Sequence, residues 1–312
     1  MNGEFPNKLK KSRTVPIYKT GDPTSRDNYR PISLLSSLSK ILEKIVSVQL
    51  VNHLDRNDIL YNHQYSFQRH KSNEQNLIQA FNYIGTAINE NKFSLGVFFD
   101  LKKAFDVCLY RVLIMKLEKI GIKGKALDWF KSYLTNRTQF VNIDGSFSSE
   151  MDILTCILQG SILGPILFLI CINDLFTVSR SLTLMFADDT FGLKSDNDLM
   201  TLIDSINTDI NMMAIWFKAN KLAVNKSKTK FITFHARSKK IPLNLPDVKI
   251  DENEPGLPFD PAKITVLERI MKKMKTLNVE HINCWAFTWM NIYHLSIMSI
   301  TLPKNLINQC TA

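Results

Sequence analysis

Apolar side chains recur every three or four residues along much of the chain, a spacing that places them on one face of an α-helix. A first helix is expected from about Ser36, with an apolar face made of Leu38, Ile41, Leu42, Ile45 and Val46. A second should begin after 72–74, and further apolar faces follow at 113–120 and 129–134. The longest pattern runs from 197 to 220, and Asn220 is expected to end that helix in a left-handed conformation.

Short apolar runs bounded by polar or turn residues predict strands between these helices. The runs occupy 15–19, 95–99, 182–186, 190–193 and 230–234. Residues 161–175 are apolar nearly all round, which predicts a helix buried on most sides, with Pro165 in its first turn. Helices that alternate with few strands make this an α+β chain.

Three aspartates lie at the ends of these predicted strands. Asp100 follows the strand at 95–99, and Asp188 and Asp189 are expected at the tip of a hairpin formed by 182–186 and 190–193. Carboxylates at the ends of adjacent buried strands repel one another, and oxygen ligands of this kind favour Mg²⁺ or Mn²⁺. Two such ions can assist an in-line phosphoryl displacement. The pattern therefore indicates the palm of a nucleic-acid polymerase.

The overall charge supports a polyanionic partner. The chain of 312 residues has a formal net charge of +10 and an isoelectric point of about 9.3, which favours nucleic acid over an anionic membrane. Its five cysteines form no Cys-x-x-Cys pair, so neither a zinc site nor a disulfide framework is expected. The stretch 282–302 lacks charged residues but is too polar to predict a membrane span, and no secretory signal is visible. An intracellular protein without a membrane partner is expected.

Several short blocks occur in a fixed order between residues 3 and 235. They are Lys19-x-Gly21-Asp22, Tyr29–Leu35, Ser39–Lys44, Phe99–Asp106, Gln159–Pro165, Ile172–Leu175, Phe186–Asp189 and Asn225–Thr229. Together they resemble the reverse transcriptase of a non-LTR (LINE-like) retrotransposon of the jockey type, a far more specific match than any one block. The resemblance implies a right-hand polymerase fold with fingers at 1–90 and a palm at 91–238. Residues 239–312 would be a divergent linker and helical tail, with the thumb missing or unrecognisable, and no endonuclease domain is expected upstream.

The resemblance also implies the chemistry of nucleotidyl transfer. Asp100 and Asp188 match the family's metal-ligating carboxylates, and Asp189 is their neighbour at the hairpin. Lys228 matches a candidate proton donor to the leaving pyrophosphate. The plainer interpretations are a solvated Asp-Asp turn and a lysine in an ordinary Asn-x-x-Lys turn.

A second set of residues is implied to bind the nucleotide. Phe105 would stack beneath the incoming sugar and exclude a 2′-hydroxyl, and Arg30 would steady the triphosphate. Gln159 and Gly160 would form a loop that supports the nucleotide and template base, glycine allowing close backbone approach. The alternatives are a core phenylalanine, a surface arginine and an ordinary turn. The implied partners are an RNA template, a DNA primer and dNTPs, and the implied location is the nucleus and cytoplasm.

The chain departs from the family pattern at three places. Ser66-Phe67-Gln68 replaces Gly-Phe-Arg, 157–158 replaces Val-Pro, and 107–110 replaces Thr-Val-Asp-His. Two other functions therefore remain open. One is a catalytically silent remnant that only binds nucleic acid, and the other is an RNA-dependent RNA polymerase, against which the aromatic Phe105 argues.

Overall fold

The computed structural model describes residues 3–249, except 103, 144, 154–156, 226, 237–238 and 243–244, together with a strand at 265–266. The chain forms two compact units, each built from separated segments. The first comprises Met1–Asn62, Lys102–Leu175 and Phe217–Ala223, and the second comprises His63–Leu101, Phe176–Trp216 and the chain from Val224 onward. The boundaries expected at residues 90 and 238 stay predictions, and most of the tail at 239–312 lies outside the described residues.

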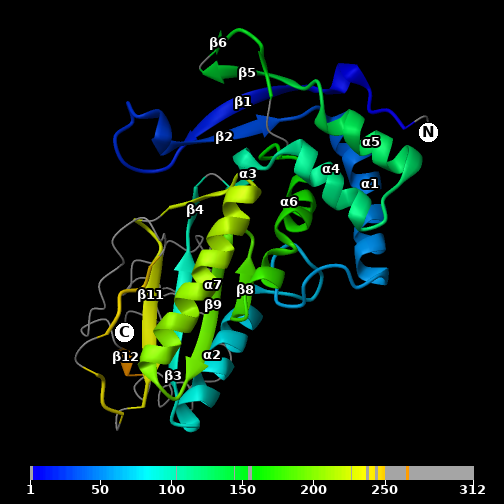
Figure 1. Cartoon of the computed structure of the whole chain (residues 1–312). Helices are drawn as coiled ribbons and strands as arrows, with labels where there is room; N and C mark the ends of the chain where they lie inside the picture. The colour runs from blue at the N-terminus through cyan, green and yellow to red at the C-terminus, as the bar shows by residue number, and fades with distance from the viewer. Residues whose placement is uncertain are drawn as a thin grey trace, which may run out of the picture. The chain divides into compact units, whose positions relative to one another are not determined.

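The sheet of the first unit has the strand order β2-β1-β5-β6 (Figure 1). Strand β7 also pairs with β5. The strands are β1 (Lys11–Tyr18), β2 (Tyr29–Leu34), β5 (Thr138–Ile143), β6 (Ser146–Phe147) and β7 (Met151–Asp152). The β1–β2 pair is antiparallel, whereas β1 and β5 are parallel although they are far apart in sequence. The strand predicted at 15–19 is thus confirmed as the end of β1.

Five α-helices and two 3₁₀ turns belong to the described part of the first unit. They are η1 (Asn7–Leu9), η2 (Arg26–Asn28), α1 (Ser37–Arg56), α3 (Ala104–Val107), α4 (Tyr110–Lys119), α5 (Gly124–Leu134) and α6 (Gly164–Ile172). Every residue of α6 from Ile166 to Ile172 is buried, and Pro165 lies in its first turn, as predicted. A helix that is apolar all round can only be stable when protein surrounds it.

Helix α1 begins where the sequence predicts, but it buries a different face. Ser36 caps its first turn by accepting a hydrogen bond from the N–H of Ser39 at 3.2 Å. The predicted apolar face is wrong, because Leu38 and Ile41 are 64% and 56% exposed in the described structure while Glu43 is 0% exposed. Glu43 can be buried because its carboxylate accepts hydrogen bonds, and the buried face of the helix combines Ser39 and Glu43 with Leu50 and Leu54.

The second unit contains an antiparallel sheet of order β11-β3-β9-β8, with β12 added in parallel to β11 (Figure 1). The strands are β3 (Phe93–Phe99), β8 (Leu182–Phe186), β9 (Asp189–Asp196), β11 (Lys230–His235) and β12 (Thr265–Val266). They confirm the four strands predicted in this region. Helix α2 (Asn73–Asn89) packs on one face of the sheet through Ala80 and Ile84. A minor ladder joins β4 (Leu101–Lys102) to β10 (Ala223–Val224), and the 3₁₀ turn η3 spans Leu175–Val178.

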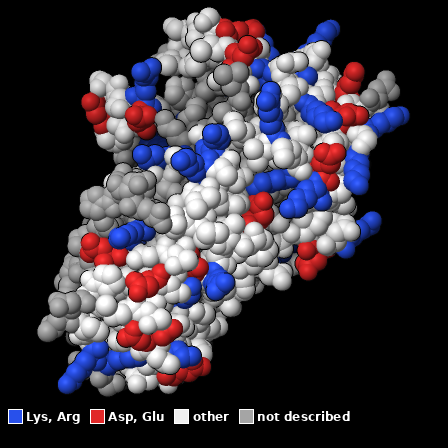
Figure 2. Space-filling view, in the orientation of Figure 1, with Lys and Arg blue, Asp and Glu red and all other residues white. Residues whose placement is uncertain are grey.

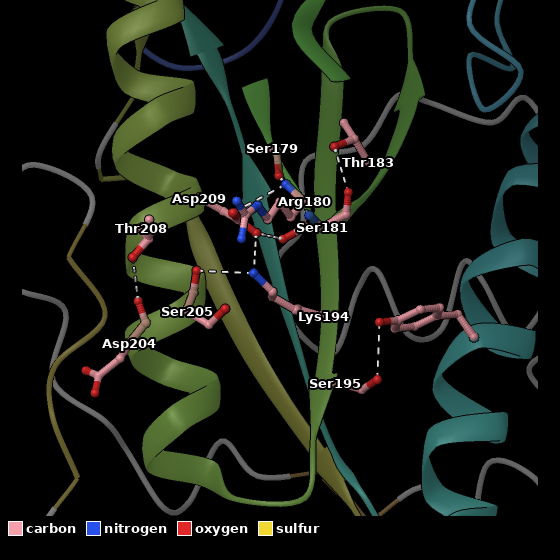
Figure 3. Close-up of polar contacts among 11 residues, drawn as sticks. Ser179, Arg180, Ser181, Thr183, Lys194, Ser195, Asp204, Ser205, Thr208 and Asp209 are labelled. Carbon is pink, nitrogen blue, oxygen red and sulfur yellow. Dashed lines mark hydrogen bonds and ion pairs between the residues drawn. The ribbon is translucent and has the colours of Figure 1, made fainter. Parts of the chain in front are cut away.

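Helix α7 (Leu199–Ala219) is joined to this sheet by a buried polar cluster (Figure 3). The carboxylate of Asp209 lies 2.8 Å from the Lys194 ammonium on β9 and also accepts a hydrogen bond from the Ser181 hydroxyl. The backbone N–H of Arg180 donates to the same carboxylate at 3.3 Å. Burial alone would raise the pKa of Asp209, but these donors outweigh it and hold the pKa below its usual value.

The end of α7 differs from the prediction by one residue. Lys221, with a φ of 60°, is the left-handed residue, and Asn220 is the last residue before it. The N–H of Leu222 donates to the carbonyl of Phe217, and that of Lys221 donates to Lys218. This is the Schellman pattern, in which the left-handed residue lies one position beyond the cap.

No helix within the described ranges is both long and apolar enough to cross a membrane. The uncharged stretch at 282–302 lies outside those ranges. On the face shown in Figure 2, Lys and Arg side chains are spread widely with Asp and Glu between them, rather than gathered in one patch.

Candidate active site

The strand register brings two of the three aspartates to the same end of the sheet. The β3–β9 pairing ends with Phe99 opposite Thr190, the residues directly before Asp100 and directly after Asp189. In the adjacent hairpin, Phe186 pairs with Asp189 and closes a loop of only two residues, Ala187 and Asp188. The hairpin prediction is confirmed, except that Asp189 is the first residue of β9 and only Asp188 lies in the loop.

The electrostatics show that these carboxylates interact. Asp189 is only partly exposed, and its pKa is raised to about 8, first by burial and then by the charges of Asp188 and Asp100. A raised pKa means that the ionised form is destabilised where it stands. A nearby cation would remove much of that penalty, so the three carboxylates form the electrostatic centre expected of a metal site.

The chemistry of these donors fits a divalent cation. Magnesium is usually held by one or two protein carboxylates, with water and substrate phosphates completing its ligands. In the described part of the chain, no three His, Cys, Asp or Glu side chains converge closely enough to hold an ion by themselves. The carboxylates of Asp100 and Asp188 therefore fit a site in which the protein supplies only part of the ligand set. The raised pKa of Asp189 beside them is consistent with such a site.

Lys228 is placed by a turn that is itself bonded to the Asp100 strand end. The N–H of Asn225 donates to the carbonyl of Asp100 at 2.7 Å, and the carbonyl of Asn225 accepts from Lys228 and Thr229. The β11–β3 pairing begins with Lys230 opposite Phe98, and Lys228 lies in the turn directly before β11. Lys228 is exposed. The turn interpretation is thus confirmed, and the role as a proton donor stays a prediction.

The β8–β9 hairpin that carries Asp188 is held by a segment that the sequence did not identify as functional. The N–H of Met185 donates to His63, the N–H of Tyr65 donates to Met185, and the N–H of Ala187 donates to the Ser66 hydroxyl at 2.8 Å. The sequence marks Ser66 only as a departure from the family pattern. Its contact with Ala187 could not be predicted because the two residues are far apart in the chain.

The four candidate nucleotide-binding residues belong to the first unit. Arg30 is exposed on β2. Phe105, in α3, is half-buried and stacks on Phe168 of α6 with ring centroids 4.2 Å apart. The Phe105 ring therefore packs partly as a core side chain. Its role in stacking beneath the sugar stays a prediction.

Glycine is required at position 160 because another group lies close to its backbone. That group is the backbone of β2, whereas the sequence predicted a nucleotide. The φ of Gly160 is 111°, and a Cβ at this position would lie 2.6 Å from the Ser33 carbonyl oxygen on β2. The N–H of Ser33 donates in turn to the Gln159 carbonyl at 2.8 Å. The Gln159–Gly160 loop is therefore fixed against β2, the strand that carries Arg30.

The buried carboxylate of Glu43 binds the chain directly after the same loop. The Glu43 carboxylate accepts from the N–H of Ile162 at 2.7 Å and from the Ser39 hydroxyl at 3.2 Å. Burial, followed by the charge of Glu43, raises the pKa of Tyr133, and burial lowers the pKa of Arg137. Sequence reasoning missed Glu43 because its partner at Ile162 is distant, although a glutamate among apolar helix positions was a visible signal.

An antiparallel sheet with carboxylates at adjacent strand ends, packed by helices, is the palm arrangement of right-hand polymerases. The solved structure of telomerase from Candida tropicalis, truncated from its C-terminal domain, matches with a TM-score of 0.54 and 16% identity. The match covers 74% of this chain and 52% of that one, and it supports the fold alone.

Comparison of the sequence with protein families shows the family to which the chain belongs. The profile of the reverse transcriptase (RNA-dependent DNA polymerase) family matches residues 10–284, and the chain belongs to that family. It is 28% identical over 249 residues to the RNA-directed DNA polymerase from the mobile element jockey of Drosophila melanogaster, covering 77% of this chain and 27% of the relative. It is 31% identical over 234 residues to a probable RNA-directed DNA polymerase from transposon BS of the same fly, covering 72% and 26%.

These relatives confirm the resemblance to non-LTR retrotransposon enzymes of the jockey type. The chain spans about a quarter of the length of these two curated relatives.

Proposed function

We propose that this chain catalyses RNA-directed DNA synthesis, in which a primer 3′-hydroxyl attacks the α-phosphate of a dNTP. The observation that carries the proposal is that β3 ends directly before Asp100, with its last residue Phe99 paired to Thr190 beside Asp189, while Asp188 lies in the β8–β9 loop. Membership of the reverse transcriptase family supports it. The basic net charge of +10 suits an RNA template and a DNA primer.

Asp100 and Asp188 would hold the divalent ions, Mg²⁺ or Mn²⁺, with Asp189 beside them. When bound, such ions make the attacking hydroxyl more acidic and neutralise charge on the leaving phosphates. Lys228, on the turn fixed to Asp100, would donate a proton to the leaving pyrophosphate.

The first unit would bind the nucleotide. The Arg30 guanidinium would contact triphosphate oxygens, and Phe105 would block a 2′-hydroxyl sterically. The Gln159–Gly160 loop would support the nucleotide and the template base. Since elements of this family copy themselves into chromosomal DNA, we propose a location in the nucleus and cytoplasm, which imaging of a tagged chain would test.

Primer extension on an RNA template with Mg²⁺ and dNTPs tests the proposal. The variant Asp188→Ala should abolish extension and still bind template–primer. Asp204→Ala is the matched control, because Asp204 is an exposed aspartate on α7, and it should extend like the wild type. Equal extension by wild type and Asp188→Ala would overturn the proposal.

A catalytically silent nucleic-acid binder is the second candidate. It is favoured by Ser66-Phe67-Gln68, which stands where the family that the sequence resembles has Gly-Phe-Arg and so lacks that arginine. RNA binding without extension by the folded wild-type chain would select this function. An RNA polymerase would instead be recognised by a preference for rNTPs over dNTPs.

A further inference from the structure

We propose that Ser66 is a positioning residue for the catalytic hairpin, holding the loop that carries Asp188 through one buried hydrogen bond. The Ser66 hydroxyl accepts from the N–H of Ala187 at 2.8 Å. Ala187 is the first residue of the two-residue loop and directly precedes Asp188. The proposal deepens the proposed function, and its catalytic part rests on that function.

The loop has a conformation that needs support. Ala187 has a φ of 56°, in the left-handed region that side chains other than glycine rarely adopt. It is also 0% exposed, so water has no ready access to its N–H. Without the Ser66 hydroxyl this buried donor would lose its partner, which makes the observed loop conformation less favourable.

The hydroxyl of Ser66 is itself fixed. It donates to the Oε1 atom of Gln64 at 2.9 Å, and the N–H of Ser66 donates to the same oxygen at 3.0 Å. Ser66 and Gln64 are both 1% exposed. Gln64 in turn bridges in parallel to Met185 on β8, two residues before Ala187. A hydroxyl that donates on one side and accepts on the other is held in a single orientation.

The Ser66 hydroxyl connects this fixed segment to the loop that carries Asp188. Because it bonds to the residue next to Asp188, its loss should affect the placement of that carboxylate and hence turnover, rather than nucleotide affinity.

The first experiment reads the anchor without reference to activity. Hydrogen exchange at the Ala187 amide should be at least about tenfold faster in Ser66→Ala than in the wild type. Ser195→Ala is the matched control, because Ser195 also forms a hydroxyl contact, 3.2 Å from the Tyr83 hydroxyl, at the far end of β9 (Figure 3). It should leave exchange at Ala187 unchanged. Unchanged exchange in Ser66→Ala would overturn the proposal.

The second experiment measures primer extension by Ser66→Ala and Ser66→Gly beside Ser195→Ala. We expect kcat to fall about tenfold with the KM for dNTP within twofold, and Ser66→Cys, a weak acceptor, to lie in between. Loss of kcat in parallel with thermal unfolding of the whole chain would overturn a positioning role. Absence of extension by the wild type would overturn the proposed function and the catalytic part of this proposal, and the exchange result would still decide whether the anchor exists.

Discussion

The carbonyl oxygen of Asp100 accepts a 2.7 Å hydrogen bond from the N–H of Asn225, which fixes the turn bearing Lys228 to the strand end bearing the first aspartate. From this we predict that Lys228→Ala lowers kcat about 100-fold, as loss of a general acid does. Lys230→Ala is the control, since Lys230 is also exposed and lies two residues further on. Steady-state extension as a function of pH is the measurement. Equal effects of the two variants would remove Lys228 from the chemistry.

Replacing Asp189 should stabilise the chain when no divalent cation is present. The folded pKa is raised to about 8 from 3.8, so folding loses stability as pH rises from about 4 through 8. Asp189→Asn lacks this penalty and should increase the free energy of unfolding at pH 8, by at most roughly 5–6 kcal/mol, since each of the roughly four pKa units corresponds to about 1.4 kcal/mol. Thermal unfolding in EDTA checks this, and near pH 4 the gain should vanish. A destabilised variant at pH 8 would contradict it.

The polar cluster at Asp209 should show the opposite dependence on pH. Its folded pKa is lowered, so its contribution is complete above the unfolded value near 3.8 and is lost as pH falls through the folded value. Asp209→Asn should cost roughly 1–3 kcal/mol at pH 7, because Lys194 and Ser181 lose a charged acceptor. Urea unfolding at pH 7 and pH 3 should show the difference shrinking at low pH. Asp204→Asn, an exposed change on the same helix, should be neutral at both.

Gly160 allows a test that separates backbone strain from a steric clash. Gly160→Ala combines a φ of 111° with a Cβ 2.6 Å from the Ser33 carbonyl, whereas Gly145 has a φ of 85° and open space around it. Gly145→Ala should cost only about 1 kcal/mol, from strain, and Gly160→Ala roughly 2–4 kcal/mol. Chemical denaturation gives both values. Similar costs would mean that the loop can move away from β2.

In helix α1 we expect replacement of an apolar residue to be tolerated and replacement of a buried glutamate to be destabilising. Ile41→Glu should change stability by less than about 0.5 kcal/mol because Ile41 is exposed, while Glu43→Ala should cost roughly 2–4 kcal/mol by removing the acceptor for Ile162 and Ser39. Glu43→Gln keeps one acceptor oxygen and should lie between them. Thermal unfolding of the three variants ranks them, and a large loss in Ile41→Glu would show that this face is covered.

The features that could be predicted from sequence are those encoded by neighbouring residues. The apolar run before Asp100 specifies β3, and the apolar run at 230–234 specifies β11. The hairpin at Asp188 follows from two short apolar runs with little between them. Each depends on a few residues in succession, so reading along the chain finds it.

The features that could not be predicted depend on distant partners. Nothing near Glu43 announces that Ile162 will supply a hydrogen-bond donor, so apolar periodicity assigned the wrong face of α1 to the core. Ser66 meets Ala187 across more than a hundred residues for the same reason. A sequence departure can mark such a position, but only the fold supplies its partner.

The central position of β3 has a consequence for synthesis on the ribosome. Its neighbours in the sheet are β9 and β11, both of which are translated much later than Phe93–Phe99. A nascent chain must therefore keep an apolar strand without its partners until Lys230–His235 has emerged, and pairings this distant form slowly. A product that stops before Lys230 would leave β3 with an open edge, and such edges recruit strands from other molecules. We therefore expect prematurely terminated copies to aggregate, whether or not their aspartates are intact.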